Sequence, residues 1–326
     1  MEWPCMTWCL QLLFVVFVVQ ICGNKGCFQE EKIALLEYKE FLKFHNYSVQ
    51  SFLSSWVNDP NSDCCTWKRV TCNSSTGHVI HLSLDSIMQE QEGCSLNLNL
   101  NLSMFQPLKE LKSLDLSSNC FSGLIITEDD HRSVSTLKML KTLDLSHNSF
   151  NWSIIRPLKS LTSLKNLILR DNYIRGDFPV QELSILQNLE MLDVSWNALR
   201  NPSTVKDFHA LSTLKKLKTL DLGYNIFDGK IFECLYALPT LSFLLLDANS
   251  ISGALNSQGL CNMKTLQQLD LSDNSISGTL STCLNNLTSL RTLDLSVGAY
   301  RHLSFLTLHP LSIFHFGRTI LKAHSH

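Results

Sequence analysis

A nine-residue motif, Leu-x-x-Leu-x-Leu-x-x-Asn, constrains the fold of this chain more than any other feature. It occurs seven times, once with Val194 in place of the last leucine, and its asparagines are 29, 24, 25, 28, 24 and 25 residues apart. They are Asn119, Asn148, Asn172, Asn197, Asn225, Asn249 and Asn274. A fixed period of about 20–50 residues is typical of solenoids, because a single repeat cannot bury its apolar side chains without its neighbours.

Each Leu-x-Leu segment predicts a short strand with its leucines inward and the residues between them outward. The asparagine is expected to turn inward and bond backbone groups, since an unpaired buried group costs about 1–3 kcal/mol. The pattern resembles the leucine-rich repeat, which implies an α/β repeat: a leucine-rich-repeat solenoid with short parallel strands on its concave face. We expect about eight repeats in residues 85–297. A degenerate first copy spans Val79 to Ile87, and a last copy begins at Leu290 and leaves the pattern at Val297.

Residues 1–23 are typical of a secretory signal peptide. The apolar run from Leu12 to Val19 is too short to cross a bilayer, which takes about 20 residues. Nine of the twelve cysteines follow this segment, so at least one is unpaired or pairs with another chain. Secretion would favour disulfides for most of the others. Five sequons predict glycosylation at Asn46, Asn73, Asn101, Asn151 and Asn286.

Residues 24–84 have the features of a cap that covers the first repeat. Glu30 to Phe44 predicts a helix with Leu35, Tyr38, Phe41 and Leu42 on one face. The segments Glu31 to Lys39, Leu53 to Trp56, Asp63 to Trp67 and Val70 to Cys72 resemble the N-terminal cap of plant extracellular leucine-rich-repeat proteins. The repeats are most similar to those of plant receptor-like proteins, which lack a kinase domain, and the resemblance covers residues 1 to about 297.

That resemblance implies two cap disulfides, Cys27–Cys64 and Cys65–Cys72. No two cysteines have the Cys-x-x-Cys spacing, so we expect no zinc site. Cys94 and Cys120 have no obvious partner. Cys261 either bonds Cys283 or is a buried free thiol, and Cys234 shares the repeat phase of Cys283.

The outward positions of the strands form columns that we expect to bind a ligand, as in receptors of this family. The column immediately before the asparagine holds very different residue types, which favours a surface selected for a partner. Aromatic residues from successive repeats are expected to lie close together, with polar side chains beside them. The predicted ligand-binding residues are His147, Arg170, Asp171, Trp196, Tyr224, Phe243 and Asp247.

Several function classes are excluded by what the sequence contains. The Asp-Leu-Ser strings recur in every repeat, so they belong to the shell rather than to one active site, and no kinase, Walker or zincin motif appears. A formal net charge of −2 gives no overall attraction for nucleic acid. We therefore predict a non-enzymatic binding protein without a cofactor or metal.

Residues 298–326 form an atypical tail. The tail has no apolar stretch long enough for a membrane anchor and holds five histidines, for which a metal-binding role is conceivable. The segment Leu303 to Phe316 could cover the last strand. We expect a truncated chain whose tail comes from an altered reading frame or an unspliced intron. The segment LNLNLNLSMF, before the first full repeat, is interpreted as a loop although its alternation also fits a strand.

We predict the ligand-recognition region of a plant receptor-like protein, binding an extracellular peptide, glycan or protein in defence or development. The family resemblance implies a co-receptor kinase as partner. Full-length relatives would reside in the cell membrane, whereas this chain would be secreted. One alternative is a secreted inhibitor of cell-wall hydrolases resembling the polygalacturonase-inhibiting proteins. The other is a truncated product without function.

Overall fold

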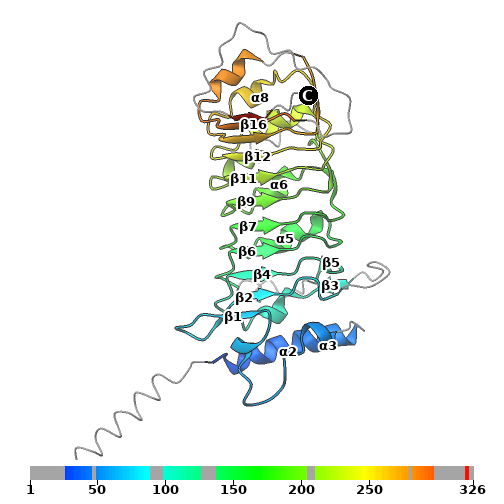
Figure 1. Ribbon diagram of the computed structural model, residues 1–326, viewed down its shortest axis with the longest axis vertical. Helices are drawn as coiled ribbons and strands as arrows, with labels where there is room; N and C mark the ends of the chain where they lie inside the picture. Colours follow the sequence, from blue (N-terminus) through cyan, green and yellow to red (C-terminus); the bar gives the residue numbers. More distant parts are fainter. Residues whose placement is uncertain are drawn as a thin grey trace, which may run out of the picture.

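The computed structural model describes residues 26–45, 49–88, 98–125, 137–203, 210–278, 281–296 and 320–322. They form a solenoid whose strands stack along its long axis, with a helical cap at the N-terminal end (Figure 1). An eleven-stranded sheet runs through it in the order β1-β2-β4-β6-β7-β9-β11-β12-β14-β16-β17. Its strands are β1 (Val70–Cys72), β2 (Val79–Ser83), β4 (Ser113–Asp115), β6 (Thr142–Asp144), β7 (Asn166–Ile168), β9 (Met191–Asp193), β11 (Thr219–Asp221), β12 (Phe243–Leu245), β14 (Gln268–Asp270), β16 (Thr292–Asp294) and β17 (Ile320–Lys322).

The leucine spacing explains the register of this sheet. From β2 to β16 the strands pair in parallel, and the central residue of each triplet is a leucine paired with the leucine of the next strand. These leucines are at most 1% exposed, and each buried side chain contributes about 1.5–3 kcal/mol. The nine strands predicted from Val79 onward are therefore confirmed. They are β2, β4, β6, β7, β9, β11, β12, β14 and β16.

The motif asparagines form a ladder behind the strands, as predicted. Asn148 Nδ2 donates to the carbonyls of Leu116, Leu145 and Ser146 at 3.0–3.1 Å, and its Oδ1 accepts the N–H of Phe121 at 3.0 Å. One amide thus satisfies backbone groups of its own turn and of the preceding repeat, which buried backbone requires. The same pattern of donation recurs at every motif asparagine.

After each asparagine the chain forms short strands and helical turns that close the repeat on its other sides. Three two-stranded parallel pairs are β3 (Leu98–Leu100) with β5 (Phe121–Leu124), β8 (Arg175–Asp177) with β10 (Ala198–Arg200), and β13 (Ser252–Gly253) with β15 (Ser275–Ile276). The helical turns are η2 (Leu102–Phe105), η4 (Trp152–Ile154), α5 (Ile155–Leu158), α6 (Val180–Leu183), η6 (Gly229–Ile231), α7 (Phe232–Leu235), α8 (Gln258–Cys261) and η7 (Thr282–Asn286).

The cap consists of α2 (Gln29–Phe44), α3 (Val49–Phe52), η1 (Cys64–Thr66) and β1. Helix α2 confirms the predicted helix and buries Leu35, Tyr38 and Leu42 completely. Strand β1 pairs with β2 antiparallel, which the repeat pattern gave no means to predict. Two disulfides link the cap, as the family resemblance implied. They are Cys27–Cys64 and Cys65–Cys72, with Cα atoms 5.3 and 5.5 Å apart.

The structure decides the state of two cysteines. Cys120, for which the sequence offered no obvious partner, is disulfide-bonded. Cys261, for which a disulfide and a free thiol were both left open, is disulfide-bonded as well. Among the described cysteines, Cys234 is the buried free thiol, and burial raises the pKa of its thiol to about 12. The side chains of Cys94 and Cys283 lie outside the described residues.

One segment prediction also changes. The LNLNLNLSMF segment was interpreted as a loop, and this is wrong at Leu98–Leu100, where β3 pairs with β5. The alternation of buried leucines signalled that strand, because Leu98 and Leu100 point into the core. At the other end of the sheet β17 pairs with β16. The segment that could cover that edge, 303–316, lies outside the described residues, as do residues 1–25 with the predicted signal peptide.

No helix in the described part of the chain is long and apolar enough to cross a membrane.

Candidate ligand-binding face

The side of the sheet opposite the leucines is the strand face, and its polar positions are partly occupied by the fold itself. In six repeats the aspartate before the last strand leucine accepts the N–H two residues further on, at 2.9–3.0 Å. We call this set the carboxylate column: Asp115, Asp144, Asp193, Asp221, Asp270 and Asp294. In four of these repeats a serine hydroxyl donates to the same oxygen. Consequently Ser146 and Ser195 are buried, although their column was interpreted as exposed.

The column is interrupted on β7 by Ile168 and on β12 by Leu245. In both repeats the residue two positions later is no longer a serine or glycine tied to the aspartate. Arg170 and Asp247 stand there, and both are partly exposed. These two positions are thus released from the turn and can contact a partner, as their assignment as ligand-binding residues requires.

The column immediately before the asparagine lies just past the strands, at a left-handed turn. All seven residues have φ between 48° and 55°. They are Ser118, His147, Asp171, Trp196, Tyr224, Ala248 and Asp273. This conformation is disfavoured for β-branched side chains, and none occurs in the column. The column therefore tolerates fewer residue types than its varied composition indicated, although its side chains do project from the edge of the strand face.

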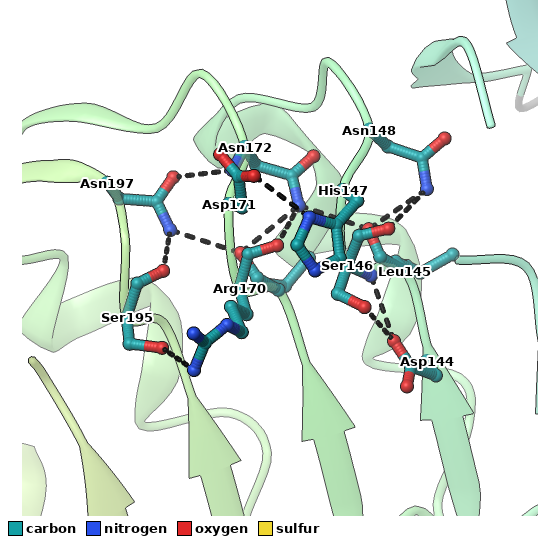
Figure 2. Close-up of polar contacts among 11 residues, drawn as sticks. Asp144, Leu145, Ser146, His147, Asn148, Arg170, Asp171, Asn172, Ser195 and Asn197 are labelled. Atoms are coloured by element: carbon teal, nitrogen blue, oxygen red, sulfur yellow. Dashed lines mark hydrogen bonds and ion pairs between the residues drawn. The ribbon is translucent and has the colours of Figure 1, made fainter. Parts of the chain in front are cut away.

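Three of the predicted residues form one continuous exposed surface, which we call the aromatic ridge: Arg170, Trp196 and Tyr224. The rings of Trp196 and Tyr224 are stacked, with centroids 3.9 Å apart and an interplanar angle of 13°. The Arg170 guanidinium lies 5.6 Å from the Trp196 ring centroid. It also donates to Ser195 Oγ at 3.5 Å (Figure 2). Trp196 and Tyr224 remain 43% and 40% exposed, so the stack presents a fixed apolar surface to solvent.

His147 and Asp171 form a polar pair beside the ridge. His147 Nδ1 lies 2.8 Å from Asp171 Oδ2, and both side chains are about half exposed (Figure 2). Both residues occupy the left-handed turn position of adjacent repeats, so the pair, like the ridge, is fixed by the backbone.

Phe243 does not join the ridge. The register aligns Phe243 with Thr219, five residues before Tyr224, so it lies near the opposite end of the strands. The expectation that it lies close to Trp196 and Tyr224 is wrong. Phe243 stands six residues before its asparagine, whereas Trp196 and Tyr224 stand immediately before theirs, so the residues belong to different columns. Phe243 is 38% exposed and remains a separate candidate contact.

The columns missed two large exposed side chains in the turns that follow the strands. Tyr173 and Ile226 directly follow their asparagines and are 61% and 53% exposed. The Arg175 guanidinium lies 5.9 Å from the Tyr173 ring centroid. The sequence signal that could have identified them is a large apolar residue directly after a motif asparagine.

Burial and mutual repulsion raise the pKa values of several carboxyl groups on the strand face. Burial, followed by the charge of Asp193, raises the pKa of Asp221 to about 6. Burial also raises the pKa of Asp144 and of Asp247 above their usual range, while Arg170 opposes the shift at Asp247. Among the described residues no group of three His, Cys, Asp or Glu side chains is placed to hold a metal ion. Repelling carboxylates would thus favour a partner that brings a positive charge or a hydrogen-bond donor.

Of the predicted glycosylation sites, Asn151 and Asn286 are exposed, and Asn73 and Asn101 are partly buried. Asn46 lies outside the described residues.

Comparison with known proteins places these features in a family. A model for the leucine rich repeat N-terminal domain matches residues 28–73, within the predicted cap. A leucine-rich-repeat model matches residues 110–128, 139–161 and 265–287. Two relatives from Arabidopsis thaliana are Receptor like protein 21, 38% identical over 68% of this chain, and Receptor-like protein 13, 36% identical over 76%. The chain spans 22% and 23% of their respective lengths.

Solved ectodomains of plant receptor kinases share the fold. That of GASSHO1/SCHENGEN3 from Arabidopsis thaliana, in complex with CASPARIAN STRIP INTEGRITY FACTOR 2, is 25% identical, with a TM-score of 0.56 over 82% of this chain and 29% of that one. The Arabidopsis receptor kinase HAESA, in complex with the peptide hormone IDA and the co-receptor SERK1, is 25% identical, with a TM-score of 0.50 over 82% of this chain and 50% of that one. With its cap, asparagine ladder and relatives, the chain belongs to the leucine-rich-repeat receptor-like proteins of plants, as a non-enzymatic ectodomain.

Proposed function

We propose that the strand face recognises an extracellular peptide in an extended conformation, and that the aromatic ridge is its main anchor. The observation that carries the proposal is the exposed stack of Trp196 and Tyr224 with Arg170 beside it. Exposed aromatic residues and arginine are the types most often found at binding hot spots. A peptide lying across the strands would contact several repeats at once.

The similar ectodomains support a peptide rather than a glycan. HAESA was solved with the peptide hormone IDA and the co-receptor SERK1. We therefore propose that a ligand-bound receptor containing this region assembles with a partner kinase and signals in defence or development. Secretion of the chain is part of the proposal, and the two cap disulfides suit an oxidising compartment.

The test begins with residues 24–326 expressed through a eukaryotic secretory pathway. A displayed library of random linear peptides is selected against the folded protein. Selected peptides are then measured for affinity against Trp196→Ala and Tyr224→Ala. Loss of a hot-spot side chain is expected to weaken binding by about 30-fold or more, which corresponds to about 2 kcal/mol.

Tyr236→Ala is the matched control. Tyr236 is 43% exposed, like Trp196, but follows α7, away from the strand face. It should change affinity less than about 2-fold, as expected for a surface position outside the interface. Peptides that bind both ridge variants and the wild type equally would refute the ridge as anchor. Binding confined to a folded cell-wall hydrolase, with no selected peptide, would instead favour an inhibitor.

A further inference from the structure

A groove of about 640 Å³ lies on another side of the solenoid, beside β8 and the short helices α5 and α6. Its size falls within the range of pockets that hold small ligands, about 300–1,000 Å³. The indole of Trp152 forms part of its wall, and Phe178 packs against that indole edge-on, with centroids 6.5 Å apart. The groove is separate from the aromatic ridge, so the proposed peptide site does not account for it.

The polar lining of the groove contains charges of both signs. Arg156 and Arg175 bring two guanidiniums, and Asp177 and Glu182 bring two carboxylates. Asp177 already accepts hydrogen bonds from Ser203 and from Arg200 Nε, the latter at 2.7 Å, and both lower the pKa of its carboxyl below the usual range. A lining with balanced charge, donors and acceptors suits a neutral, polyhydroxylated ligand better than an anion or a cation.

The Trp152 side chain also has an unsatisfied hydrogen-bond donor. Its Nε1–H is buried and has no hydrogen-bond partner among the described residues. Buried polar groups in native proteins almost always have a partner, so this one indicates a missing acceptor near the wall. A hydroxyl or amide oxygen entering the groove could supply it after a small shift of the ring.

The sequence places a source of such a ligand at the rim. Asn151, Trp152 and Ser153 form a sequon, and its last two residues line the groove. Asn151 is exposed and caps η4, because its Oδ1 accepts the Ser153 N–H at 2.9 Å. Its Nδ2, the atom that would carry a glycan, makes no hydrogen bond to another described residue. A sugar attached there would be covalently held beside the groove at high effective concentration.

We propose that the groove is the seat of the first two N-acetylglucosamine residues of a glycan on Asn151. The apolar faces of these sugars pack on the Trp152 indole, and their hydroxyl and acetamide groups bond the arginines and carboxylates of the lining. The glycan then acts as a structural part of this side of the solenoid. It does not depend on ligand recognition by the strand face.

The first test compares Ser153→Ala with Thr288→Ala in the secreted chain, because each removes a sequon while its asparagine, and with it the Asn151 cap of η4, stays in place. Asn286 lies on an exposed sequon in η7 and does not line the groove. Mass spectrometry establishes occupancy of both sites, and thermal melting reports stability. Loss of the Asn151 glycan should lower Tm by about 2–4 °C, the range expected for a modest stabilising contact in a domain of this size. Loss at Asn286 should shift Tm by less than about 1 °C. An unoccupied Asn151, or equal shifts for the two variants, overturns the proposal.

A second test removes the indole while keeping the sequon. Trp152→Leu lowers stability by itself, because it loses the contact with Phe178. Its double-mutant cycle with Ser153→Ala, which keeps the Asn151 cap, isolates the coupling between glycan and ring. The effect of Ser153→Ala should nearly vanish in the Trp152→Leu background, and an unchanged effect refutes packing on the indole.

Native wild-type protein provides a measurement that needs no variant. An endoglycosidase that cuts between the first two sugars should act at least about 10-fold more slowly at Asn151 than at Asn286, because it can cut only the small fraction of unseated glycan. Equal rates at the two sites would contradict the proposal.

Discussion

The cap and the repeats satisfy their buried polar groups in different ways. In the cap each contact is used once and joins distant parts of the chain. Lys39 Nζ donates to the carbonyls of Leu53 and Trp56 at 2.8 and 2.6 Å. The buried carboxylate of Glu31 accepts the Val79 N–H at 3.2 Å and thereby ties α2 to the first strand of the parallel stack.

In the repeats one residue type performs the same task seven times. Each motif asparagine bonds its own turn and its immediate neighbour, so every link spans about one repeat. The comparison teaches that the two regions should fail differently. A substitution that breaks a cap contact should unfold the whole cap, whereas a substitution in the asparagine ladder should destabilise only two adjacent repeats. Because stability in a solenoid is nearly a sum of nearest-neighbour contributions, the second kind of damage should stay local.

The largest expected effect is in the cap. Replacing Cys27 and Cys64 by serine removes a cross-link over 37 residues, which costs about 4 kcal/mol on the chain-entropy model. We expect α2 to lose protection from hydrogen exchange while β12 to β14 keep theirs. Replacing Cys65 and Cys72, only 7 residues apart, should cost about 2.5 kcal/mol. Uniform loss of protection along the whole chain would contradict the idea that the cap is a separate unit.

The next effect is in the ladder. Asn172→Ala leaves the N–H of Phe150 without its acceptor. The carbonyls of Leu145 and Leu169 lose one donor each but keep a second, from Asn148 and Asn197. We expect a loss of about 2 kcal/mol, since one buried unsatisfied group costs about 1–3 kcal/mol. Hydrogen exchange should rise in these two repeats only. Asn188→Ala, at a surface asparagine, is the control and should change stability by about 0.5 kcal/mol or less.

How much of this fold the sequence predicted depends on how often a signal recurs. The leucines and asparagines repeat in phase, so the nine strands and the ladder could be predicted from spacing alone. The cap disulfides came from family resemblance. Strand β1 depends on a pairing made once, between segments with no common period, so spacing could not predict it. The bonded state of Cys120 had no signal in the repeat spacing either.

The carboxylate column provides a smaller, pH-dependent effect. The pKa of Asp221 is raised from its ordinary value of 3.8 to about 6, so the folded state disfavours its ionisation. Below pH 3.8 the carboxyl is protonated in both states and no penalty exists. As pH rises through 6, the penalty develops fully. Asp221→Asn should therefore raise stability at pH 7 by about 1–2 kcal/mol, after allowance for partial exposure, and by almost nothing at pH 4. Urea unfolding at both pH values measures this, and a pH-independent difference would refute it.

The smallest effect tests the left-handed turn. Ser118 has φ of 54°, a conformation that glycine adopts without steric cost. Ser118→Gly should raise stability by about 0.5 kcal/mol, because relief of strain slightly exceeds the entropy that glycine adds to the unfolded chain. Ser122→Gly, at a β5 residue without positive φ, should lower stability instead. If both glycines destabilise, the turn is not strained.

The candidate site was less predictable than the fold for a related reason. Columns read from the sequence give the repeat in which a residue lies and its distance from the asparagine. They identified His147, Asp171, Trp196 and Tyr224 as neighbours across repeats. They could not show that an aspartate two residues earlier ties down a serine, nor that Phe243 belongs to the far end of the strands.

The strand register also has a practical consequence. The repeats that end at Asn148 and Asn225 are longer than the others, 29 and 28 residues against 24 or 25. Even so, Ser113 pairs with Thr142 and Met191 with Thr219 without a shift. Additional chain is therefore accommodated between β5 and β6 and between β10 and β11, away from the paired triplets. An affinity tag or fluorescent reporter inserted at either place should leave the binding surface in its original alignment, whereas one inserted between a strand and its asparagine should not.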